Sequence, residues 1–196
     1  TFISYLENNS LINYFNARAK LQGENWIDFE REIKGVVNEF KIIEFELKKS
    51  NQCVYRTDKN HKVHQILKQL NPDYVIVYLW DEISLFNVHK SLCKSLNYFC
   101  LALEYYISVF INETPIKGVS QDIIDFDANK VLTFNYSDTY ERMYGGVRWD
   151  ESIDHVHGVA IGNLENEPNI ILGITTYEES LQNYYVEFEK YFQRIT

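Results

Sequence analysis

The stretch from Val131 to Gly145, VLTFNYSDTYERMYG, constrains the fold more than any other part of the sequence. It begins as a run of apolar, β-forming residues and takes on helical spacing within a few positions. A near-continuous apolar run is typical of a parallel strand covered on both faces, and the helix after it completes a strand-to-helix unit. The sequence therefore predicts an α/β fold with a parallel sheet.

Other segments predict helices and strands by the spacing of their apolar residues. Two long segments before the strands keep helical spacing, and the opening residues, TFISYLENNS, also indicate an amphipathic helix. Asn71-Pro72 ends a shorter helix, because the residue before proline disfavours the helical conformation. We expect helices at residues 25–49, 61–70, 84–111 and 178–195, and strands at residues 130–134, 153–157 and 170–174. Residues 73–82 are ambiguous.

Size and composition bound the domain organisation. The chain has 196 residues, of which 45% are hydrophobic and 15% aromatic, and this is enough apolar material for one core. We expect a single α/β domain over residues 1–196, with a mainly helical part at residues 25–112 and a strand-rich core at residues 129–196.

The charge of the chain argues against a nucleic-acid partner. The sequence has 28 acidic and 19 basic residues, a formal net charge of −9, whereas binding to a phosphate backbone needs clustered Lys and Arg. A small anionic cofactor stays compatible with this charge, because backbone N–H groups at a helix start can hold phosphate.

The three cysteines, Cys53, Cys93 and Cys100, are an odd number without paired spacing, which indicates neither a disulfide framework nor a zinc ribbon. Cys93 and Cys100 share an apolar helix face, and we expect buried, unreactive thiols with no histidine to activate them. Polar residues interrupt every long apolar stretch before it reaches membrane-spanning length. We therefore expect a soluble, cytoplasmic protein.

The residues after the first predicted strand form one candidate site. The segment from Asp138 to Glu141 has the pattern of a capping box, so we expect a helix to begin near Asp138. Asn135 then lies at the carboxyl end of the strand, at the crevice where open parallel sheets bind ligands. Its amide would orient a water or a sugar hydroxyl there, and an ordinary turn cap is the alternative interpretation.

A second candidate, His157, ends the strand predicted at residues 153–157, and Gly158 after it allows a tight turn or close approach of a ligand. Histidine titrates near neutral pH, which suits a general base, although a lone histidine is more often a hydrogen-bonded structural residue. His155 and His157 face the same way on a strand, so with Asp154 or a distant carboxylate they form an alternative metal site. A metal-dependent hydrolase is the corresponding alternative function.

The stretches FNYSDTYERMYG, IDHVHG and NIILGI together resemble the core of the AbiH family, bacterial proteins of phage abortive infection, and through it the sirtuin-like NAD-binding fold. NWIDFE and FEKYFQRI also resemble AbiH segments. The resemblance implies a Rossmann-like (sirtuin-like) parallel sheet with flanking helices and a long-helix insertion, and a nucleotide-binding core at residues 129–196. The Asn-Gly-Phe-Asp loop of such proteins does not occur in the chain, so we expect the chain to be part of a longer protein.

The resemblance also implies roles for single residues. Asn135 and His157 would flank the nicotinamide ribose, with His157 taking a proton and Asn135 positioning the attacking oxygen. Ser137 stands where sirtuin-like motifs usually have Asp. The implied cofactor-binding residues are Phe134, Asn135, Tyr136, Ser137, Asp138 and Gly158.

The leading hypothesis is a phage-defence protein that binds NAD and hydrolyses its nicotinamide-ribose bond. Cleaving this bond builds positive charge on the sugar, so the enzyme must hold the ribose and pyrophosphate and present water to that carbon. A non-catalytic nucleotide-binding sensor or interaction module is the first alternative. The expected partners are a small-molecule nucleotide, a phage or host protein that triggers the response, and a second copy of the chain, with no membrane and no nucleic acid.

Overall fold

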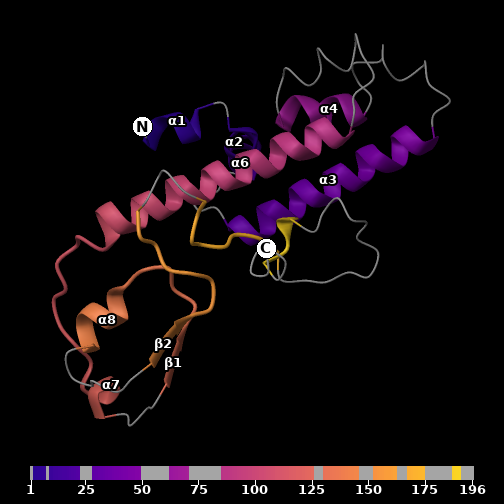
Figure 1. The fold of residues 1–196 in the computed structure, drawn as a ribbon. Helices are drawn as coiled ribbons and strands as arrows, with labels where there is room; N and C mark the ends of the chain where they lie inside the picture. The colour runs from indigo at the N-terminus through magenta and orange to yellow at the C-terminus, as the bar shows by residue number, and fades with distance from the viewer. Residues whose placement is uncertain are drawn as a thin grey trace. The chain divides into compact units, whose positions relative to one another are not determined.

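Most of the described chain is helical. The structure is a computed structural model, and it describes residues 2–7, 9–22, 28–49, 62–70, 85–125, 130–145, 152–162, 167–174 and 187–190. The elements are α1 (Phe2–Leu6), α2 (Ser10–Gln22), α3 (Phe29–Lys49), α4 (Lys62–Leu70), α6 (Leu85–Tyr106), the π-helical turn η1 (Ile107–Ile111), α7 (Gln121–Asp125), β1 (Lys130–Thr133), α8 (Thr139–Tyr144) and β2 (Ser152–His155) (Figure 1). None of the described helices combines the length and apolar character needed to cross a membrane.

The chain groups into two compact units. One consists of Thr1–Ile3 and Cys100–Ile171, and the other of Ser4–Phe99 and Leu172–Thr196. The division falls inside α6 and does not coincide with the predicted division between the helical part and the strand-rich core. The prediction of a single domain stays a prediction.

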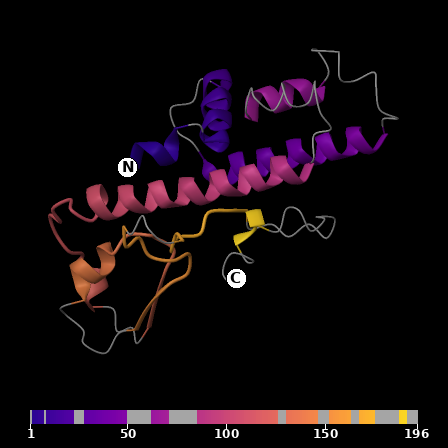
Figure 2. The same ribbon diagram turned by 45° about the horizontal axis from the view of Figure 1, so that its top comes forward.

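The second unit contains a helical core built from the predicted amphipathic segments. In both ribbon views α3 and α6 run side by side (Figures 1 and 2). The ring of Phe29 lies 5.0 Å from that of Phe99, and the ring of Phe40 lies 6.3 Å from that of His89, so the two helices are antiparallel. Helical spacing in α3 accordingly yields one buried face, as predicted. The buried side chains of this face are Ile33, Val36, Val37, Phe40 and Ile43.

Helix α2 is an element that the sequence analysis does not predict. Its start is capped by Asn9, whose Oδ1 accepts hydrogen bonds from the N–H groups of Leu11 (3.0 Å) and Ile12 (3.2 Å). The same side chain donates from Nδ2 to the carbonyl oxygen of Ser95 in α6 (2.8 Å). One buried asparagine thus both starts α2 and attaches it to α6.

The strands β1 and β2 form a two-stranded parallel sheet within the described part of the chain. This confirms strands near residues 130–134 and 153–157, but the prediction that both faces are covered is wrong. Leu132 is 59% exposed and Phe134 is 65% exposed. A run of apolar residues predicts that a segment is a strand. Whether other elements cover both of its faces depends on residues elsewhere in the chain. The described fold is mostly helical with a small parallel sheet, and these residues do not establish a Rossmann-like sheet.

The third predicted strand, at residues 170–174, is not a strand in the structure. Ile174 makes an isolated parallel bridge with Glu189. The N–H of Ile174 donates to the carbonyl of Phe188 (2.8 Å), and the N–H of Lys190 donates to the carbonyl of Ile174 (3.2 Å). Most of the helix predicted at residues 178–195 and the ambiguous residues 73–82 lie outside the described part of the chain.

Candidate functional site

The parallel pairing brings the two predicted catalytic residues to the same edge of the sheet. Because Thr133 pairs with His155, Asn135 and His157 each lie two residues beyond the end of a strand. The N–H of Val156 donates to the carbonyl of Thr133 (2.9 Å), which extends the ladder past the strand ends. The carboxyl ends of parallel strands are where such sheets bind ligands.

The side chain of His155 links this edge to α8. Its Nε2 lies 2.5 Å from Oε1 of Glu141, and its Nδ1 lies 3.1 Å from the carbonyl oxygen of Asn135. A carbonyl oxygen and an ionised carboxylate only accept hydrogen bonds, so this pair of partners favours the imidazolium form, in which both ring nitrogens donate. In that form His155 presents no lone pair to a metal ion or to a substrate proton.

The pKa of His155 is raised above its usual value of 6.5, so the charged form of the ring persists to higher pH than in a free histidine. Burial has the largest single influence and lowers this pKa. The hydrogen bond to Glu141, the hydrogen bond to the carbonyl of Asn135 and the negative charges of Glu141 and Asp138 together outweigh burial.

The helix expected near Asp138 is confirmed as α8, but the predicted capping box does not form. Asp138 is at the N-cap position without a side-chain cap hydrogen bond, and its carboxylate lies 3.8 Å from the guanidinium of Arg142. Glu141 bonds to His155 and does not reach back to the cap. A charged donor is a stronger partner for a carboxylate than a backbone N–H group, which explains the difference.

The side chain of His157 lies in the turn after β2, beside two predicted cofactor-binding rings. Its ring centre is 5.6 Å from that of Phe134 and 6.4 Å from that of Tyr136. The hydroxyl of Tyr136 donates to the carbonyl of Ile171 (2.8 Å), and the N–H of Ile171 donates to the carbonyl of His157 (2.9 Å). These two bonds hold the histidine turn and Tyr136 against one strand-like segment.

The predicted tight turn at Gly158 is present, and glycine is required there. The backbone has a φ of +84°, and a Cβ at this position would lie 1.7 Å from the carbonyl oxygen of Asn169. The group that approaches Gly158 closely is therefore backbone of the same chain.

Glu104 of α6 supports this turn and was not singled out from the sequence. Its carboxylate is 1% exposed and accepts hydrogen bonds from the N–H of Asn169 (2.8 Å), from Nδ2 of Asn169 (3.1 Å) and from the N–H of Ile161 (3.1 Å). The sequence did contain a signal, because Glu104 shares a helix face with the buried Cys100 and Ile107. An acidic residue on an apolar face needs buried donors.

The remaining predicted residue, Ser137, belongs to the turn into α8. Its hydroxyl oxygen lies 2.9 Å from that of Thr139. The structure therefore groups Phe134, Asn135, Tyr136, His157 and Gly158 at the strand ends, and it assigns Ser137 and Asp138 to the start of the next helix.

Among the described residues, Asp154, His155 and His157 are not brought together as a group of metal ligands. The carboxylate of Asp154 pairs with Nζ of Lys130 across the strands at 2.6 Å, and both ring nitrogens of His155 contact other groups. Within the residues that the structure describes, the group of three metal-binding side chains is His89, Cys93 and Glu187.

The expectation that no histidine lies near Cys93 is wrong. Nε2 of His89 is 3.4 Å from Sγ of Cys93, one turn away on α6. This spacing of four residues was visible in the sequence and places both side chains on one helix face. Burial, followed by the negative charge of Glu187, raises the pKa of Cys93 to about 12, so the metal-free thiol is protonated near neutral pH. The expectation that both thiols are buried is confirmed for Cys100 and wrong for Cys93, which is half-buried.

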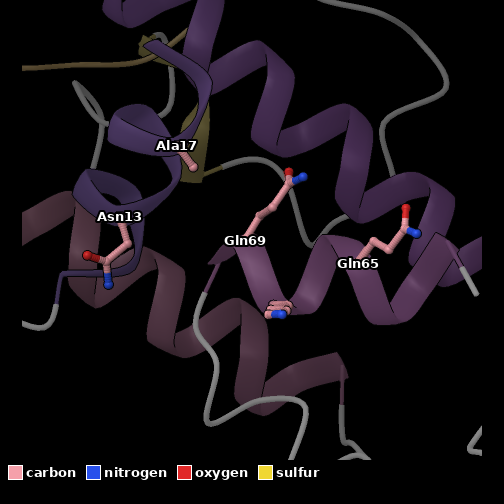
Figure 3. A pocket seen from close by; sticks show the side chains of 5 residues that line it. Asn13, Ala17, Gln65 and Gln69 are labelled. Atoms are coloured by element: carbon pink, nitrogen blue, oxygen red, sulfur yellow. The ribbon is translucent and has the colours of Figure 1, made fainter. Parts of the chain in front are cut away.

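A surface hollow of about 560 Å³ lies between α2 and α4, and the described residues that line it differ from those predicted for the site. Figure 3 shows Asn13 and Ala17 on α2 and Gln65 and Gln69 on α4, and Lys68 completes the lining. These side chains include no carboxylate, histidine or thiol. Among these five side chains, the amine of Lys68 is the group capable of acid-base or nucleophilic chemistry.

Comparison with known proteins identifies the family. The family model described as "Bacteriophage abortive infection AbiH" matches residues 2–196. The chain belongs to the AbiH family. No curated protein and no solved structure matches it significantly. Membership confirms the AbiH resemblance of the sequence motifs and suggests a role in phage abortive infection. The sirtuin-like part of the resemblance does not follow from membership or from the two strands of this AbiH protein, and it stays a prediction.

Proposed function

We propose that this AbiH protein acts in phage defence by binding NAD at the carboxyl ends of β1 and β2 and hydrolysing its nicotinamide-ribose bond. One observation carries the proposal: Asn135 and His157 lie two residues past the ends of two paired parallel strands. The family supports the defence role. The NAD chemistry rests on the geometry of this edge and on the resemblance of its motifs.

The backbone of Asn135 is held at both ends, which suits a residue that positions a reactant. Its N–H donates to Oγ1 of Thr133 (3.1 Å), and its carbonyl accepts from the ring of His155. Its side chain is exposed and is available to a ligand. A fixed backbone reduces the entropy lost when a side chain aligns a water molecule.

The proposed reaction needs one proton acceptor. Water adds to C1′ of the ribose, the electron pair of the broken bond returns to the pyridinium nitrogen of nicotinamide, and His157 takes the proton of the water. Asn135 orients that water through its amide. Phe134 and Tyr136 present aromatic rings beside His157, and such rings stack on a planar base.

The decisive assay is release of nicotinamide from NAD by the full-length protein, followed by chromatography. We expect His157→Ala to lower the rate by about a hundredfold or more, the usual range for loss of a general base, with an unchanged circular dichroism spectrum. Asn135→Ala should also lower the rate, whereas its matched control Asn16→Ala, on an exposed position of α2, should not. Full activity of His157→Ala would remove this residue from the base role.

A nucleotide-binding sensor without turnover is the second candidate function, and one observation favours it. Tyr106 at the end of α6 and three residues of η1 (Val109, Phe110 and Ile111) are exposed apolar side chains, of which Phe110 is 56% exposed. Exposed apolar groups of this kind favour contact with another protein. Calorimetric binding of NAD without nicotinamide release, abolished by Asn135→Ala, would favour the sensor over the hydrolase.

The defence role is tested separately in bacteria that produce the full-length protein. We expect phage yield to fall relative to cells with His157→Ala or without the protein. Equal phage yield in all three would contradict defence by this site, whatever the outcome with purified NAD.

A further inference from the structure

A histidine, a cysteine and a glutamate converge within the helical unit. His89 and Cys93 lie one turn apart on α6, and Glu187 comes from the described segment at residues 187–190. Nε2 of His89 is 3.4 Å from Sγ of Cys93 and 3.4 Å from Oε2 of Glu187. All three donor atoms lie within 4.8 Å of one another.

Nε2 of His89 faces both a thiol and a carboxylate. An N–H···O bond has an ordinary length of about 2.9–3.0 Å, and the separation between His89 and Glu187 exceeds it. One ring nitrogen of a neutral imidazole carries either one hydrogen or one lone pair, yet Nε2 of His89 faces both neighbours. Sγ of Cys93 also lies 4.0 Å from Nδ1 of the same ring, and the three donor atoms lie within 4.8 Å of one another.

The two distances from Nε2 of His89 match those between ligands of a tetrahedral zinc ion, and Sγ of Cys93 would swing from beside the ring toward the Nε2 lone pair on binding. Zinc binds nitrogen at about 2.0–2.1 Å, sulfur at about 2.3 Å and carboxylate oxygen at about 2.0–2.2 Å. Tetrahedral angles then separate nitrogen from oxygen and nitrogen from sulfur by about 3.3–3.6 Å. Both measured separations from Nε2 of His89 are 3.4 Å. We propose that His89, Cys93 and Glu187 bind one zinc ion, with water at the fourth position.

The surroundings of the cluster suit a metal that is partly shielded from water. The rings of Phe40 and Phe188 lie 6.3 Å and 6.1 Å from the ring of His89, which is itself buried. Glu187 is exposed and leaves a path by which an ion can enter. A mixed set of one imidazole, one thiolate and one carboxylate favours zinc over the hard ions magnesium and calcium, which prefer oxygen ligands.

Zinc would attach the segment that contains Glu187 to α6. That segment already pairs through Phe188 and Lys190 with Ile174, and Lys190 forms an ion pair with Glu30 of α3. Binding would convert the Cys93 thiol to a thiolate and release its proton. Three protein ligands plus water is also the ligand pattern of catalytic zinc sites, so the proposal goes beyond the NAD chemistry at Asn135 and His157.

The test uses cobalt(II) as a coloured substitute for zinc in the full-length protein freed of metal. We expect one equivalent of cobalt to produce the near-ultraviolet absorption of a cobalt-thiolate bond, and zinc to displace it. Cys93→Ser should abolish that absorption, while the matched control Cys100→Ser, on the same helix, should keep it. Absence of the absorption in the wild type, or its retention in Cys93→Ser, would overturn the proposal.

A second variant decides the question if Cys93→Ser fails to fold by circular dichroism. Glu187 is exposed, so Glu187→Gln should leave the fold intact and retain the thiolate absorption. We expect its affinity for cobalt to fall by at least about tenfold, since even groups outside the ligand shell contribute 10–100-fold. Unchanged affinity would exclude Glu187 as a ligand and overturn the three-residue site.

Discussion

Replacing Glu104 by alanine is expected to destabilise the turn that carries His157. The buried carboxylate accepts three hydrogen bonds from Ile161 and Asn169, at 2.8–3.1 Å. Hydrogen bonds to charged groups contribute about 1.5–3 kcal/mol each, so their sum is an upper limit of roughly 4.5–9 kcal/mol. Bonds that share one carboxylate are not additive, and removing the carboxylate also removes the cost of burying it. Since each N–H donor left without an acceptor costs about 1–3 kcal/mol, we expect a net loss of about 3–5 kcal/mol in the free energy of unfolding.

Urea unfolding followed by circular dichroism measures this loss, and amide hydrogen exchange locates it. A loss of about 3 kcal/mol corresponds to a roughly hundredfold change in an equilibrium constant, so the amides of Ile161 and Asn169 should exchange about a hundredfold faster. Glu104→Gln keeps one acceptor oxygen, and we expect a smaller loss of about 1–2 kcal/mol.

The control for this prediction is Glu113→Ala, because Glu113 is exposed in the segment after η1. Its stability should change by less than about 0.5 kcal/mol. The reasoning would be refuted if Glu104→Ala lost less than about 1 kcal/mol, or if exchange at Ile161 and Asn169 stayed as in the wild type. Either result would mean that the cost of burying the carboxylate cancels its three hydrogen bonds.

Three further predictions follow from single contacts. Gly158→Ala should cost more than about 2 kcal/mol in thermal unfolding, because its Cβ would meet the backbone of Asn169 at a left-handed φ, and a wild-type Tm would contradict this. The pKa of His155 in the folded protein is raised above 6.5, partly by Glu141. The wild type should therefore be more stable than Glu141→Gln. This difference in the free energy of unfolding should be fully present below about pH 6.5 and lost as pH rises through the folded pKa. A difference in urea midpoint between wild type and Glu141→Gln that does not change with pH would contradict this role of the His155–Glu141 pair. Asn9→Ala should cost about 1–3 kcal/mol in urea unfolding, since it removes the cap of α2 and a buried bond, and a loss equal to that of the exposed Asn16→Ala would contradict it.

The long helices were predictable because their signal is local. Apolar residues at three- and four-residue steps in α3 predicted the buried face that includes Ile33 and Phe40. Helix α2 was missed because it depends on a contact from outside its own sequence, the bond between Asn9 and Ser95. The third predicted strand failed for a similar reason. An apolar run such as NIILGI favours extended backbone, but a strand needs a partner with matching register.

The positions of the candidate residues at the strand ends were predictable from the sequence, but the hydrogen-bond partners of the neighbouring side chains were not. Asn135 and His157 stood out because each follows a β-forming run, and the parallel register does bring them to one edge. The partner of Glu141 was not predictable. The capping-box pattern predicted that this carboxylate bonds to the backbone at the start of its own helix, whereas in the structure it bonds to the ring of His155.

The sequence by itself determined where the main helices and the first two strands lie, which residues end those strands, and the resemblance to the AbiH family that the family match confirms. These properties depend on spacing and motifs within a few residues of one another. Only the tertiary structure decided that Glu104 holds Asn169 and that Glu187 joins His89 and Cys93. Those contacts join residues that are far apart in the chain. The distance between such residues is set by the folding of the whole chain, so no local sequence pattern predicts the contact.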